Sequence, residues 1–217
     1  MCIRDSTSSA ANTIQVYQNL NRGYPITLYE KGPNGEYKIE LSATDTYWAQ
    51  YAYQFSHEYC HVRTNYEEAK SKTMWFEEVI GEVCSLYTLQ KMSDAWAVNP
   101  PYEGWRSFSS KLADYRNDIV SRQAHQLPAG VTFKSWLRTT LPELEKNPQL
   151  RGKNTIIAIE LLPLFESNAL TWQTLLYWNQ WPATDDIDIW EAFEMWHQAL
   201  PTKIKPAARE LINVLEN

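Results

Sequence analysis

The chain has 217 residues, enough to bury most of the surface that it exposes when unfolded, as one domain or two closely packed parts. It contains 20 Lys and Arg against 26 Asp and Glu, and its isoelectric point is near 5.3. This acidic balance argues against a nucleic-acid-binding surface, which needs a basic stripe. No apolar run reaches the length of a membrane span.

Cysteine is sparse: Cys2, Cys60 and Cys84 do not make a disulfide framework. Cys60 and Cys84 are expected to pack as small buried thiols, and a bridge between them is the less favoured alternative.

The amino-terminal part begins with M-C-I-R-D-S at 1–6, which resembles the translated sequencing-adapter remnant that caps some metagenomic reading frames. We leave it out of the fold prediction, and the compartment stays unknown.

Residues 12–19 fit either a strand or an irregular segment that leads into the fold. Residues 24–31 and 36–42 alternate with the strand period around a G-P-N-G turn, which predicts an antiparallel β-hairpin.

Helical periodicity takes over after residue 44. A first helix carries residues 48–61, a polar connection spans 63–72, and a second helix covers 73–92. Further helices are predicted at 105–126, 132–146, 154–167, 170–179, 185–199 and 205–216. The fold class is therefore α+β and mainly α. We expect a catalytic part over 7–100, made of the hairpin and the first two helices, and a helical lobe over 101–217 that closes a cleft.

The first helix contains H-E-Y-C-H at 57–61, an H-E-x-x-H pattern. Residues four apart on a helix lie about 40° apart around the axis and about 6 Å along it, so His57 and His61 present both imidazoles on one face. This arrangement suits a zinc ion. Cys60 points about 100° away from His61 and is not expected to be a ligand.

A hydrolytic zinc site needs a third protein ligand and one open position. Glu78 is our candidate, because the 16 residues between His61 and Glu78 allow a turn and a second helix that runs back past the metal. Glu82 lies four residues further on the same helix face, where it can accept the free N–H of a ligand histidine. Glu58 follows the first ligand and can take a proton from a water molecule at the open position.

These residues resemble the gluzincin family of zinc peptidases, whose members combine H-E-x-x-H with a later glutamate ligand and an acidic residue four positions beyond it. The run W-F-E-E-V-I-G-E at 75–82 is similar to the W-L-N-E-G-F-A-E segment of the aminopeptidase branch. The resemblance implies a zinc metallopeptidase with His57, His61 and Glu78 as ligands, Glu58 as general base and Glu82 behind the metal. No G-A-M-E-N-like segment precedes the motif, so aminopeptidase specificity does not follow.

The resemblance also implies a side chain that hydrogen-bonds the developing oxyanion. Tyr102, in the proline-rich segment after the second helix, is our candidate, with His125 next. The chain has 13 tyrosines, and a loop tyrosine more often packs on an aromatic neighbour than takes part in catalysis. In gluzincins an edge strand before the first zinc helix pairs with extended substrate, and one strand of the hairpin can do so here or simply cover the helix.

The expected function is hydrolysis of a peptide or protein substrate with zinc as cofactor. Two alternatives stay open: a zinc-stabilised binding module that never turns over, and a zinc hydrolase of a non-peptide amide. The sequence leaves substrate specificity and oligomeric state unknown.

Overall fold

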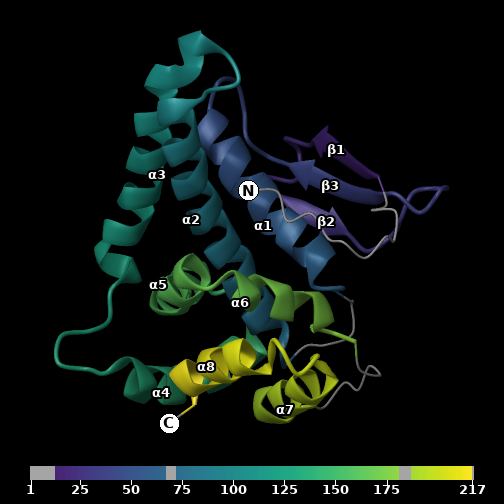
Figure 1. The fold of residues 1–217 in the computed structure, drawn as a ribbon, viewed down its shortest axis with the longest axis vertical. Coiled ribbons are helices and arrows are strands. Elements are labelled where there is room, and N and C mark those ends of the chain that lie inside the picture. Colours follow the sequence, from purple (N-terminus) through teal and green to yellow (C-terminus); the bar gives the residue numbers. More distant parts are fainter. Residues whose placement is uncertain (1–12, 67–71, 181–186, 217) are drawn as a thin grey trace.

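A computed structural model of the chain describes residues 13–66, 72–180 and 187–216. The adapter-like residues 1–6 and part of the polar connection lie outside this range. Figure 1 shows a small sheet on one side of α1, the helices α2 and α3 on its other side, and the helices α4 to α8 below them. The predicted α+β, mainly α fold class is confirmed.

The sheet has three strands in the order β1-β3-β2, namely β1 (Ile14–Gln18), β2 (Ile26–Leu28) and β3 (Tyr37–Leu41). The predicted hairpin is present, because β2 and β3 pair antiparallel with Ile26 opposite Glu40. β1 pairs parallel to β3, which makes the sheet mixed. Within the described residues β2 has a strand neighbour on one side only.

Two helices hold the centre of the molecule. α1 (Trp48–Arg63) lies between the sheet and α2 (Met74–Val98), as Figure 1 shows. α2 runs past the predicted end at residue 92. The added stretch contains Trp96, which packs against a small buried cluster that includes Leu89 and against the rings of Trp105 and Phe108. Side chains on several faces of α2 are buried, because neighbouring elements surround it.

The remaining helices follow in chain order. They are η1 (Glu103–Phe108), α3 (Ser109–Ser121), η2 (Gln123–His125), α4 (Phe133–Lys146), α5 (Arg151–Ser167), α6 (Ala169–Thr174), η3 (Leu175–Tyr177), α7 (Ile189–Ala199) and α8 (Lys205–Leu215). The helix predicted at 105–126 is thus three pieces, with 3-10 turns on both sides of α3. α7 begins later than predicted, because Asp188 caps it by accepting the Trp190 and Glu191 N–H groups; residues 185 and 186 lie outside the described range.

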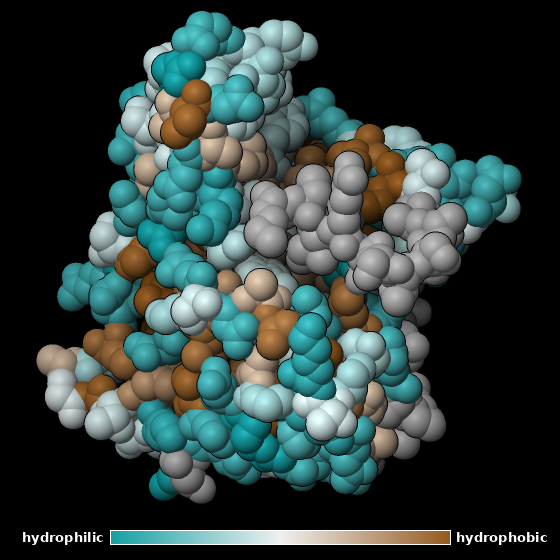
Figure 2. Space-filling view, in the orientation of Figure 1, coloured by the Kyte–Doolittle hydropathy of each residue, from teal (hydrophilic) through white to brown (hydrophobic). Residues whose placement is uncertain are grey.

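The main hydrophobic core joins α2 to the C-terminal helices. Phe76 on α2 packs against Trp178, Phe193 and Trp196, which are all nearly inaccessible to solvent. Trp178 and Trp196 are therefore core residues, as their helical spacing indicates, and Trp172 and Trp190 are partly buried against the same core. Trp181 lies outside the described residues. On the face in Figure 2, hydrophilic side chains cover most of α3. Among the described helices, none is both long and apolar enough to cross a membrane.

Candidate metal centre

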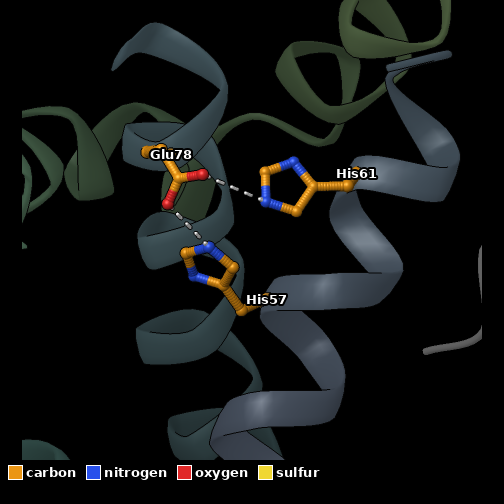
Figure 3. A group of neighbouring side chains, drawn as sticks. All are labelled: His57, His61 and Glu78. Carbon is orange, nitrogen blue, oxygen red and sulfur yellow. Dashed lines mark ion pairs between the residues drawn. The ribbon is translucent and has the colours of Figure 1, made fainter. Parts of the chain in front are cut away.

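The three predicted ligand side chains, two from α1 and one from α2, lie close together. His57 and His61 project from successive turns of α1 toward the carboxylate of Glu78 on α2 (Figure 3). The distance from His57 Nε2 to Glu78 Oε2 is 3.4 Å, and from His61 Nε2 to Glu78 Oε1 it is 3.7 Å. The structure thus brings the three predicted ligands together.

The donor set and its spacing fit zinc. Two ligand atoms about 2.1 Å from one zinc ion at a tetrahedral angle lie about 3.4 Å apart. The ligand atoms of His57, His61 and Glu78 all lie within 4.8 Å of one another, so small movements of these side chains toward a common centre give this geometry. Two imidazoles and one carboxylate are also the protein ligands of one class of hydrolytic zinc sites.

The charges at the site are strongly coupled. Burial lowers the pKa of His57, but the hydrogen bond to Glu78 and the nearby carboxylates outweigh it and raise that pKa to about 9. Burial raises the pKa of Glu78, yet the two histidines bring it down to about 2. The pKa of His61 is lowered, first by burial. The metal-free site therefore holds a proton on His57 against an ionised Glu78, and a metal ion must displace that proton.

Gly81 lets His57 approach α2. A Cβ added at Gly81 would lie 2.7 Å from His57 Cε1 and 2.8 Å from His57 Nε2, closer than real Cβ contacts. Any side chain at this position would therefore push the imidazole out of place. The sequence carried a signal for this residue, since a glycine inside a helical pattern usually has a packing reason.

Glu58, the predicted general base, is held by the sheet. It is 4% exposed, and Thr27 on β2 donates its hydroxyl proton to Glu58, with 3.0 Å from Oγ1 to Oε2 and 2.8 Å to the carbonyl oxygen. These contacts fix the carboxylate beside the metal ligands. Sequence reasoning did not find Thr27, because a threonine on a short strand looks like any other strand residue.

Glu82 lies where its spacing predicts, but its hydrogen bonds go elsewhere. Tyr53 donates to Glu82 Oε2, and Thr155 Oγ1 donates to Glu82 Oε1 over 3.2 Å. Across the described residues, no hydrogen bond joins Glu82 to His57 or His61. Its charge does help to raise the pKa of His57, so Glu82 acts on the ligand electrostatically.

The candidate metal centre opens into a cavity of about 520 Å³. His125, the second candidate for the oxyanion contact, lines this cavity, with its Nδ1 2.7 Å from the carbonyl oxygen of Ile119. Tyr102, the first candidate, does not: it is 67% exposed and packs on Trp105 with ring centroids 4.9 Å apart. Tyr102 does not lie at the candidate metal centre, because it follows the C-terminal end of α2, several helical turns away from Glu78 near the start of that helix.

Comparison of the chain with protein-family models, with curated proteins and with solved structures finds no match. The geometry of the site therefore carries the functional argument.

Two further features complete the surroundings. Cys60 and Cys84 are free thiols that hydrogen-bond to each other across α1 and α2; the sequence favoured free thiols over a bridge.

Glu77, the acidic neighbour of Glu78, is 5% exposed and accepts a 2.9 Å hydrogen bond from Asn179 Nδ2. Asn179 also donates to the carbonyl of Thr64, which ties the segment after η3 to the connection between α1 and α2.

Proposed function

We propose that the protein is a zinc-dependent hydrolase of peptide bonds. The observation that carries the proposal is the convergence of His57, His61 and Glu78 at one point, with Glu58 beside them and a cavity in front. The gluzincin resemblance of the same residues supports it. When bound, zinc would act as a Lewis acid that polarises the scissile carbonyl and makes a water molecule at the open position more acidic.

Glu58 supplies the proton transfer. Its carboxylate takes a proton from the attacking water and delivers it to the nitrogen of the leaving amine. Thr27 keeps this carboxylate in place by donating a hydrogen bond to Oε2, so little reorganisation precedes the reaction. Of the two residues considered for the oxyanion, His125 is the one that lines the cavity. Because its Nδ1–H points at the Ile119 carbonyl, only the doubly protonated ring can donate from Nε2.

The edge of β2 that has no neighbour among the described strands supplies a place for the substrate backbone beside Ile26 and Thr27. Ile26 and Thr27 line the cavity, and among the described strands β2 is paired only with β3. An extended peptide that adds to this edge hydrogen-bonds through its main chain and lies along the same wall that holds Glu58. This mode of binding suits a peptide better than a compact substrate.

The test is Glu58→Gln in the zinc-loaded protein, assayed with a peptide library. We expect a loss of about 10²- to 10⁴-fold in kcat, because proton transfer fails, with zinc affinity unchanged. A wild-type protein that binds zinc but cleaves no peptide in the library would contradict the proposal. Cleavage of small non-peptide amides would then indicate a zinc hydrolase of non-peptide amides. Absence of cleavage of both substrate classes would indicate a zinc-stabilised binding module.

A further inference from the structure

The wall of the cavity carries charges of both signs. Its acidic side chains all come from α1 and α2 around the metal centre; they are Glu58, Glu77, Glu78 and Glu82. The part of the wall that runs from α3 through η2 to the start of α5 contributes the charged residues Arg122 and Arg151, with no Asp or Glu among them. A chain with a net charge of −6 thus places two arginines in the wall of the cavity that contains its metal centre.

Arg151 is held close to the metal centre. It is the first residue of α5, and its carbonyl oxygen accepts a 2.9 Å hydrogen bond from Thr155 Oγ1, which also donates to Glu82. The first turn of α5 is therefore tied to a residue one helical turn beyond Glu78. The charge of Arg151 also helps to lower the pKa of Glu78, which agrees with this placement.

The guanidinium of Arg151 has no carboxylate partner among the described residues. Its basic neighbours do: Lys153 pairs with Glu143, and Arg122 Nη2 lies 2.5 Å from Asp118 Oδ2. Arg151 is exposed to the cavity and stands at the positive end of a 17-residue helix. An arginine that has no carboxylate partner in the described part of the chain and lines a cavity favours an anion, and its planar fork matches a carboxylate with two parallel hydrogen bonds.

We propose that Arg151 binds a carboxylate of the substrate, so that the preferred substrates are peptides with a negative charge close to the scissile bond. This inference rests on the proposed peptidase function. Arg122 adds positive charge to the same cavity wall while remaining paired with Asp118. The carboxylate is either the C-terminus of the peptide or the side chain of an Asp or Glu, and both present the same group to Arg151.

The experiment measures binding without turnover. Three labelled peptides are titrated with the zinc-loaded Glu58→Gln protein, and binding is followed by the fluorescence anisotropy of the label. Two peptides share one sequence and differ only in a free or an amidated C-terminus. The third is the amidated peptide with one internal Glu added. We expect at least one carboxylate peptide to bind about tenfold or more tighter than the neutral amidated peptide. The free C-terminal and Glu peptides distinguish the two sources of the carboxylate.

Substitution of Arg151 tests the assignment. Adding Arg151→Gln should abolish the preference for the carboxylate peptide, and Arg151→Lys should restore part of it. Lys153→Gln removes the same charge two residues along α5, outside the cavity wall, and should leave the preference intact. Equal binding of all three peptides, absence of binding by all of them, or a preference that survives Arg151→Gln would overturn the inference.

The result is separable from that of the proposed function. If the wild-type protein cleaves peptides but shows no Arg151-dependent preference, the carboxylate site is wrong and the hydrolase stands. If the Arg151-dependent preference appears but the wild-type protein cleaves no peptide, the carboxylate site stands and the peptidase function is wrong.

Discussion

Gly81→Ala perturbs the metal centre through a single methyl group. The new Cβ would meet three atoms of the His57 ring at 2.7, 2.8 and 2.9 Å, whereas ordinary contacts begin at 3.4 Å. The ring must therefore move by roughly 0.7 Å, which exceeds the tolerance of about 0.2 Å in metal–ligand distances. Because this ring is a proposed ligand, we expect zinc affinity to fall about ten- to a hundredfold, the range seen when a residue that supports a ligand is lost.

In the Gly81→Ala protein, the free energy of unfolding and the zinc affinity report on different effects of the added methyl group. Alanine is favoured over glycine inside a helix by about 0.5–1 kcal/mol, while overpacking costs about 1–3 kcal/mol. The free energy of unfolding of the metal-free Gly81→Ala protein should thus fall by no more than about 2.5 kcal/mol. Zinc affinity is measured by competition with a chromophoric chelator, and unfolding by urea titration of the metal-free proteins.

Gly152→Ala is the matched control. It also replaces a helical glycine, but its Cβ would lie 3.7 Å from the nearest atom, the carbonyl oxygen of Ala124, which is an ordinary contact. It should therefore leave zinc affinity unchanged. If Gly81→Ala binds zinc as tightly as the wild type and Gly152→Ala, the proposed position of the His57 ring in the metal centre is wrong.

Three further predictions concern residues around the centre. Thr27→Val removes the hydroxyl that holds Glu58, so kcat should fall about tenfold or more while zinc affinity stays within twofold, and an unchanged kcat would contradict the role of Thr27. Because the pKa of His57 is raised to about 9, its proton stabilises the metal-free fold fully below pH 6.5, and this contribution is lost as pH rises through 9. Zinc must displace this proton, so its apparent affinity should rise up to about tenfold per pH unit from 7 to 9 and then level off; an affinity independent of pH in calorimetric titrations would refute this. Asn179→Gly keeps the left-handed backbone (φ 63°) but removes a donor to the buried Glu77, so urea denaturation should show a loss of about 1–3 kcal/mol, and an unchanged midpoint would count against this contact.

The convergence of His57, His61 and Glu78 could be predicted because metal-ligand chemistry restricts the spacing of such residues. His57 and His61 are four residues apart and so share a helix face, and a third ligand was expected from elsewhere in the fold. Glu78 was the candidate, because its distance along the chain allows a second helix to run back past the two histidines, and the structure brings its carboxylate beside them. The strand and helix periods likewise predicted the hairpin and most helices within a few residues.

What the sequence could not predict depends on long-range contacts. The spacing of Glu82 placed it on the correct face of α2, but its hydrogen-bond partners Tyr53 and Thr155 come from two other helices. Tyr102 was chosen for its loop, and only the extra length of α2 shows that it lies away from the cavity. The parallel pairing of β1 with β3 also joins segments whose periodicity carries no information on direction.

Zinc K-edge X-ray absorption of the zinc-loaded protein tests the metal centre most directly. The account predicts one ion per chain with two imidazole nitrogens and one carboxylate oxygen at about 2.0–2.2 Å, and a loss of this signal in Glu78→Ala. A sulfur scatterer at about 2.3 Å would instead place the ion at Cys60 and Cys84. That result, or a chain that binds no zinc at all, would contradict the account.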